Sequence, residues 1–184
     1  MNLLEQLTPD QKVFIASMPY RVGLWMSYSD QTGGMEADVK EKIALENILH
    51  GFAGQVFGSE LLQYVMQATI DHQEKWNEWG DNLEEFPDQA KRSCEILSEY
   101  FDKKEVTAYA IRLMEIAEAV ALAFREQKDL SAIDMLKLRI EYFLSGLKTR
   151  GLPQKSFEQF LNISKDERTA LGRLADALGR PRTI

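Results

Sequence analysis

Apolar residues recur three or four positions apart in several long segments, and polar turns or glycines separate these segments. The first segment is near 9–29, where Thr8, Pro9 and Gln11 form a capping box with a first-turn proline. Pro19 lies inside it, so we expect a kink or a break there. Further helices are predicted near 35–50, 59–80, 87–102, 104–127 and 131–146, with two more after Pro153 and Ser164. No segment alternates as a strand does, so the pattern predicts an all-α fold of seven to eight helices.

The segment 104–127 is predicted to lie at the centre of the bundle. It contains neither glycine nor proline, and its apolar residues keep helical spacing throughout. Five alanines give it a small-residue face that lets neighbouring helices pack closely: Ala110, Ala117, Ala119, Ala121 and Ala123.

A weak internal repeat links the two halves of the chain. Residues 24–49 and 120–144 each contain an apolar helix end, a polar turn and a second amphipathic helix. This pattern predicts two helical hairpins with approximate internal two-fold symmetry, although similar hairpins also arise by chance in helical bundles. We expect residues 1–150 to form one helical domain and residues 151–184 a C-terminal helical extension packed on it.

The charge of the chain argues against nucleic-acid binding. The sequence has 22 Lys and Arg against 29 Asp and Glu, a formal net charge of −7, whereas a nucleic-acid binder concentrates basic residues on one face. Between residues 71 and 105, acidic residues outnumber basic ones 11 to 5. We expect this stretch to be a solvated surface; a face for a basic or metal-bearing partner is the alternative.

The sequence also predicts a cytoplasmic protein without membrane insertion. Cys94 is the only cysteine, so no internal disulfide can form and a reducing compartment is expected. The N-terminal residues do not resemble a signal peptide. The longest uncharged stretches, such as 47–59, fall short of the roughly 20 residues that span a bilayer.

Few residues have the pattern of a catalytic centre. His50 is expected to complement the dipole at a helix end, and His72 to be a solvated helix residue. Cys94 lies on an apolar helix face and is read as a small buried hydrophobe. Trp76 and Trp79 either cover the end of the bundle, which we expect, or form an exposed aromatic contact for a partner.

The turn after the first helix is a candidate cation site. Asp30, Glu36 and Asp38 surround the glycine pair at 33–34, and carboxylates held around a turn suit Ca²⁺ or Mg²⁺. The same carboxylates suit capping of the second helix, whose N-terminus is electropositive. We expect capping, without a required cofactor, because the spacing does not match an EF-hand loop.

The chain resembles the tellurite-resistance TerB-like family of bacterial helical proteins over about two thirds of its length. The resemblance is carried by residues 22–30, Gly33, Glu36, 44–45 and 48–49 in the first half, and by 117–124, 130–131 and Asp134 in the second. It implies an Asp-Gly turn followed by a glutamate in each half. Here Gln31 stands at the first glycine position, and Gln127 and Lys128 replace the second Asp-Gly pair. If the family binds cations at paired acidic turns, this chain retains at most half of the site.

Two functions of different kinds follow. The resemblance implies a non-enzymatic binding or scaffold module linked to stress or metal-ion (tellurite-type) response, acting through protein contacts. The alternative is an enzyme or small-ligand-binding protein with an apolar pocket inside the bundle, lined by Trp25, Tyr28, Met66 and Tyr109. The first is favoured over an enzyme. A homodimer is also expected, because symmetric dimers are the commonest soluble oligomers.

Overall fold

The computed structural model describes residues 6–29, 35–55, 58–123 and 165–180, with 35–41 and 165 described by their backbone alone. These residues form six α-helices, three short 3₁₀ helices and no β-strand, which confirms the all-α prediction. The α-helices are α1 (Pro9–Ser27), α2 (Met35–Ala53), α3 (Glu60–Asp71), α4 (Phe86–Ser98), α5 (Lys103–Ala123) and α8 (Lys165–Ala177). The 3₁₀ helices are η1 (Gln73–Lys75), η2 (Glu78–Gly80) and η3 (Leu83–Glu85). The helices predicted near 131–146 and after Pro153 lie outside the described residues.

The start of α1 is fixed by local sequence. The Thr8 hydroxyl oxygen accepts a hydrogen bond from the Gln11 backbone N–H at 3.2 Å, and the Gln11 side chain accepts one from the Thr8 N–H at 2.9 Å. This confirms the predicted capping box. Pro19 lies inside α1 without dividing it into two helices.

The start of α3 is capped twice. The Ser59 hydroxyl oxygen accepts from the Leu62 N–H at 3.0 Å, which confirms the predicted cap. Glu105, in the first turn of α5, adds a second acceptor: its Oε2 accepts from the Ser59 hydroxyl at 2.6 Å and from the Leu61 N–H at 3.0 Å. A carboxylate at a helix N-terminus also complements the helix dipole, so α5 helps to stabilise the beginning of α3.

The prediction that the third helix continues to Gly80 is wrong. α3 ends at Asp71, and the chain continues through η1 and η2. The Thr69 carbonyl, which would accept from residue 73 in a continuing α-helix, instead accepts from the Trp76 indole N–H at 2.9 Å. Trp76 and Trp79 are both buried, which confirms that they cover the bundle rather than project from it.

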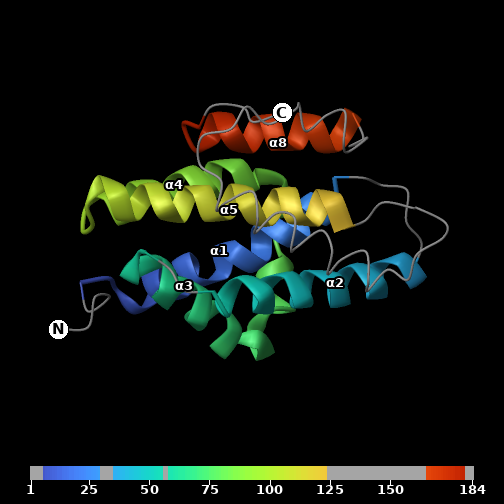
Figure 1. Ribbon diagram of the computed structural model, residues 1–184, viewed down its shortest axis with the longest axis horizontal. Helices are drawn as coiled ribbons and strands as arrows, with labels where there is room; N and C mark the ends of the chain where they lie inside the picture. The colour runs from blue at the N-terminus through green and yellow to red at the C-terminus, as the bar shows by residue number, and fades with distance from the viewer. Residues whose placement is uncertain (1–5, 30–34, 56–57, 124–164, 181–184) are drawn as a thin grey trace.

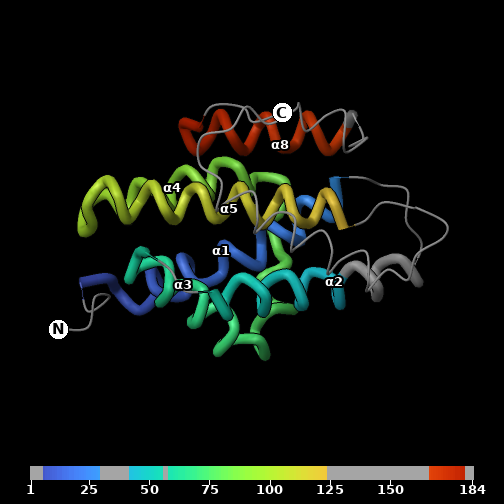
Figure 2. The backbone as a smooth tube through the Cα atoms, in the orientation of Figure 1, coloured from blue at the N-terminus to red at the C-terminus, as the bar shows by residue number. Residues whose placement is uncertain are grey.

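Two helices, α1 and α5, form the centre of the described fold. They pack against each other, and each also contacts α2, α3, α4 and α8. This confirms the predicted central position of α5, whose Ala117, Val120 and Ala121 are buried. In Figure 1, α8 lies above α4 and α5, α2 and α3 lie beneath them, and α1 rises obliquely from below until its C-terminal end reaches the level of α5; Figure 2 traces the same path.

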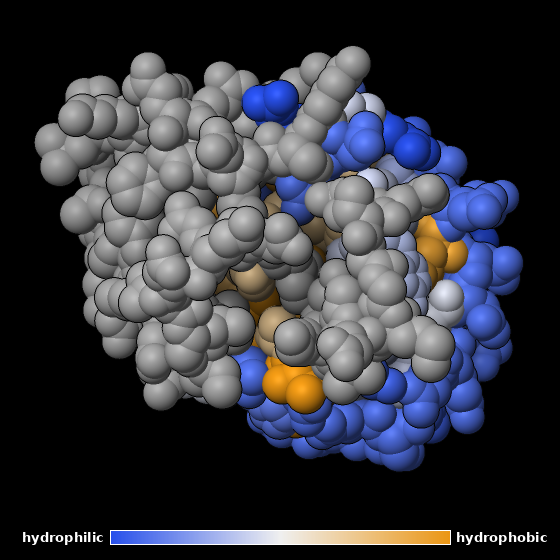
Figure 3. Space-filling model, turned by 90° about the vertical axis from the view of Figure 1, so that its right-hand side faces the viewer, coloured by the Kyte–Doolittle hydropathy of each residue, from blue (hydrophilic) through white to orange (hydrophobic). Residues whose placement is uncertain are grey.

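The surface of the described part is largely polar. Ten of the eleven acidic residues between 71 and 105 are exposed and Glu105 is half-buried, so the acidic side chains of this stretch are solvated, as predicted. On the described part of the face drawn in Figure 3, hydrophilic residues predominate and hydrophobic ones form small areas. No helix in the described ranges has both the length and the apolar character needed to cross a membrane.

Candidate functional site

A cleft of about 380 Å³ opens between α1, α2 and the stretch 73–85 that contains η1, η2 and η3, which we call the 3₁₀ segment. Aromatic packing forms its inner wall: the Tyr20 and Trp76 rings stack with centroids 4.7 Å apart and planes 20° apart. Both side chains are buried, and burial raises the pKa of the Tyr20 phenol. The described lining residues are Tyr20, Leu24, Ser27, Tyr28, Lys42, Leu45, Trp76, Asn77, Gly80 and Asp81.

Polar contacts tie the rim of this cleft together. Lys42 on α2 donates from Nζ to the Asn77 side-chain oxygen at 2.6 Å. Arg21 on α1 donates from Nη2 to the Asp81 carbonyl at 2.8 Å. Tyr28 lies at the end of α1 with 56% of its surface exposed. The cleft therefore combines a fixed aromatic wall with the Lys42 ammonium, the Asp81 side chain and the exposed ring of Tyr28.

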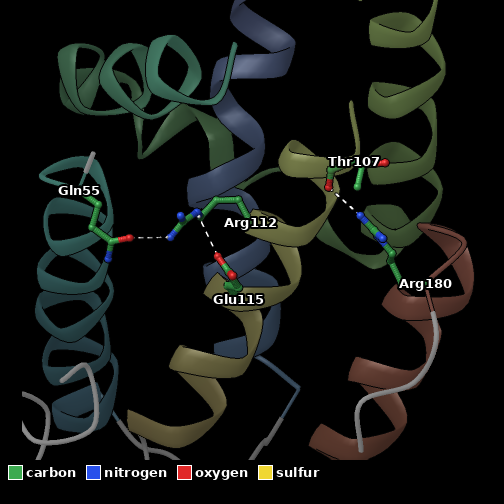
Figure 4. A network of polar contacts seen from close by, with 5 residues as sticks. All are labelled: Gln55, Thr107, Arg112, Glu115 and Arg180. Carbon is green, nitrogen blue, oxygen red and sulfur yellow. Dashed lines mark hydrogen bonds and ion pairs between the residues drawn. The ribbon is translucent and has the colours of Figure 1, made fainter. Parts of the chain in front are cut away.

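A charged pair is buried on α5, on the side that faces the end of α2. Arg112 Nε lies 3.2 Å from Glu115 Oε2, and each residue is only 7% exposed. Arg112 also donates from Nη1 to Gln55 Oε1 at 3.3 Å (Figure 4), and its guanidinium lies 4.5 Å from the centroid of the Phe52 ring. Burial lowers the pKa of Arg112 and raises that of Glu115, and in each case burial outweighs the charge of the partner. Desolvation therefore dominates the energetics of this pair.

The raised pKa of Glu115 gives a prediction for the pH dependence of stability. Below the ordinary value of 4.5 the carboxyl is protonated in both the folded and the unfolded chain. Between that value and the raised folded-state pKa, the folded state keeps the proton that the unfolded state has lost, so stability falls until the pH has passed the folded-state pKa. Relative to Glu115→Gln, the wild-type free energy of unfolding should therefore decrease above pH 4.5. Urea unfolding of both proteins across a pH series measures this; a relative increase would mean that Arg112 outweighs burial.

The four residues predicted to line an internal pocket occupy two different environments. Trp25, Met66 and Tyr109 are buried in the packed core. The Trp25 and Phe86 ring centroids are 5.5 Å apart, and the Tyr109 hydroxyl donates to Ser93 Oγ at 3.1 Å. Tyr28 alone of the four lines the cleft.

The predicted cation site falls mostly outside the described residues. Asp30 is not among them, and Glu36 and Asp38 are described only as backbone positions near the start of α2. The choice between capping and cation binding at this turn therefore stays a prediction. Elsewhere in the described ranges, no three His, Cys, Asp or Glu side chains are grouped so that they could hold a metal ion.

The two histidines and the cysteine lie on helices or at a helix end, outside the cleft. The His72 Nδ1 lies 2.8 Å from the Ala68 carbonyl at the end of α3, and His50 is exposed in the last turn of α2. Cys94 is half-buried on α4, where burial raises the pKa of its thiol to about 11. The thiol is therefore protonated at neutral pH, and Cys94 is only partly buried where the sequence predicts a buried residue.

Sequence reasoning missed most of the cleft and the buried pair. Lys42, Asn77 and Asp81 come together only because separate segments fold against one another, so no local sequence pattern predicts that they share a cleft. Arg112 and Glu115 carried a usable signal. They stand three residues apart within the otherwise uncharged run 106–117, and such a run on a central helix predicts that its charges are buried.

The chain matches no protein-family model, and comparisons with curated proteins and with solved structures find no similar protein. The resemblance to the TerB-like family therefore stays a prediction from the motifs quoted above.

Proposed function

We propose that this chain is a non-catalytic helical binding module, and that its partner contacts the cleft between α1, α2 and the 3₁₀ segment. The observation that carries the proposal is Tyr28, the most exposed large hydrophobic side chain among the described residues, at the mouth of a cleft with a fixed aromatic wall. Exposed tyrosines beside a preformed cavity are typical anchors of protein–protein contacts, because one end of the ring is apolar and the other forms hydrogen bonds.

The rigidity of the cleft supports this proposal. The Trp76 indole is held by the Thr69 carbonyl, and both Lys42 and Arg21 hold the 3₁₀ segment against the helices. A cleft formed before the partner arrives spares the entropic cost of ordering its walls on binding. A partner side chain can therefore bind in this cleft without first ordering its walls.

We include in this proposal the family, the cellular role and the self-association that the sequence predicts. A TerB-like module would serve a stress or metal-ion response in the cytoplasm, built from two hairpins related by approximate symmetry. The first of these hairpins would be α1 with α2, which are in contact. A homodimer is one form that the partner contact could take.

A photocrosslinking residue at Tyr28 tests the proposal in cells that produce the protein. We expect one discrete crosslinked species from position 28. A crosslinker at Tyr64, an exposed tyrosine on α3 outside the cleft, should not give it. The mass of the species distinguishes a second copy of the chain from another protein.

A cleft-filling variant provides the matched control. The crosslink from position 28 should be lost in Gly80→Phe, because Gly80 lines the cleft and a Cβ there meets only Leu24 Cδ2 at 3.4 Å. It should persist in Gly58→Phe, where the added Cβ meets no atom within 4 Å. The absence of any species at position 28, or equal yields in the two glycine variants, would contradict the proposal.

A further inference from the structure

A second opening, of about 390 Å³, lies between α4, α5 and the residues that follow α8. It shares no lining residue with the cleft described above. Its described lining residues are Cys94, Ser98, Phe101, Lys103, Val106, Thr107, Ala110, Leu178, Gly179 and Arg180. We call it the α4–α5–α8 groove.

The chemistry of this groove is unusual for an acidic protein. Phe101, Val106, Ala110 and Leu178 give it apolar walls. Its charged lining residues are Lys103 and Arg180, and none of the described lining residues is acidic, although the chain as a whole carries a net charge of −7. The groove therefore complements a ligand that is apolar along its length and anionic at one point.

The end of α8 is built so that Arg180 reaches the groove. Gly179 has a positive φ of 61°, the left-handed conformation that glycine adopts without steric cost. The Arg180 N–H donates to the Ala175 carbonyl at 2.8 Å and the Gly179 N–H to the Asp176 carbonyl at 3.2 Å, the two bonds of a Schellman motif. The Arg180 side chain then donates from Nη2 to the Thr107 carbonyl on α5 at 2.7 Å, as Figure 4 shows. Backbone and side chain together fix this cation beside α5.

We propose that the α4–α5–α8 groove binds a small amphiphilic carboxylate, of the type of a medium-chain fatty acid anion. Its apolar chain lies along Phe101, Val106 and Leu178, and its carboxylate is bound by Lys103 and Arg180. The volume of about 390 Å³ lies in the range of small-molecule ligand pockets, roughly 300–1,000 Å³. One N–H of Arg180 is engaged by Thr107, and the remaining N–H donors of Arg180 and the Lys103 ammonium can donate charge-assisted hydrogen bonds to both oxygens of a carboxylate.

The proposal is tested by isothermal titration of the full chain with decanoate below its micellar concentration. We expect saturable binding to one site. Decanol and decyltrimethylammonium have the same apolar chain without the negative charge, so they should bind at least about tenfold more weakly, because each lacks the charge-assisted hydrogen bonds. Acetate has the carboxylate without the long alkyl chain of decanoate. It should also bind at least about tenfold more weakly, because it buries far less apolar surface.

Two variants assign the site. Lys103→Glu should weaken decanoate binding by at least about tenfold, whereas Lys104→Glu should not, because Lys104 is exposed beside it without lining the groove. Val106→Trp should fill the groove and abolish binding while the circular dichroism spectrum stays helical. It should also leave the Tyr28 crosslink intact, so failure here is separate from failure of the proposed function. Equal binding of decanol and decanoate, equal effects of the two lysine variants, or no saturable binding would overturn the proposal.

Discussion

Glu115→Leu should lower the free energy of unfolding by about 3–5 kcal/mol, because it removes the carboxylate that lies 3.2 Å from the buried Arg112 guanidinium. Replacing both residues, as Arg112→Met with Glu115→Leu, should restore stability to near the wild-type value or above it. The reason is that both charges are desolvated at a cost that their attraction does not offset, as the directions of both pKa shifts indicate. Apolar side chains of similar volume avoid that cost and keep the contact with Phe52.

Urea unfolding of the wild type, the two single variants and the double variant measures this coupling as a double-mutant cycle. The exposed pair Lys91 and Glu95 on α4 is the matched control, since its side chains are 61% and 64% exposed and 4.0 Å apart. Glu95→Leu should change stability by no more than about 0.5 kcal/mol. A double variant as unstable as Glu115→Leu alone would show that the buried pair is itself stabilising relative to apolar side chains, and strict additivity of the single variants would show that the two side chains are not coupled.

Gly23→Ala should destabilise the fold by about 1–3 kcal/mol, although alanine is the better helix former. A Cβ at Gly23 in α1 would lie 2.1 Å from Leu45 Cδ1 on α2. Leu45 is 1% exposed and packs between the helices beside the cleft, so Leu45 must leave its rotamer or the two helices must separate. The same substitution at Gly51 in α2 meets no atom within 4 Å. Gly51→Ala should therefore stabilise the fold by about 0.5–1 kcal/mol.

Thermal and urea unfolding of the two glycine variants separates packing from helix propensity. The clash with Leu45 makes a further prediction for the double variant. Leu45→Ala alone leaves a cavity and should cost about 2–5 kcal/mol, but the same change should cost less in the Gly23→Ala background, where the new methyl group occupies part of that space. Stabilisation by Gly23→Ala, or strict additivity with Leu45→Ala, would show that α1 and α2 have room to adjust.

Helix starts could be predicted from the sequence where their signals are local. The Thr8–Gln11 capping box and the Ser59 cap involve residues three positions apart, and both are present as predicted. The end of α3 could not be predicted this way. The Thr69 carbonyl is taken by the Trp76 indole, and the Trp76 ring is held in turn by Tyr20 on α1. A contact across more than fifty residues of chain therefore decides where that helix stops.

The candidate sites show the same division. The sequence predicts Tyr28 in the lining of an apolar pocket inside the bundle together with Trp25, Met66 and Tyr109, but Tyr28 lines the open cleft and the other three lie in the core. An aromatic or sulfur-containing side chain suits a core as well as a pocket, so its type does not distinguish the two. The α4–α5–α8 groove depends on Arg180 reaching Thr107, 73 residues earlier in the chain.

Glu105 bears on the order in which the helices form. Its carboxylate caps α3 through Leu61 and Ser59, which precede it by 44 and 46 residues. Closing so long a loop costs entropy that only later contacts repay. The first turn of α3 thus gains its second cap only when α5 has docked against it, and until then that turn relies on Ser59 alone. The completed cap of α3 therefore depends on the docking of the central helix, which makes a local helix end part of the tertiary assembly of the bundle.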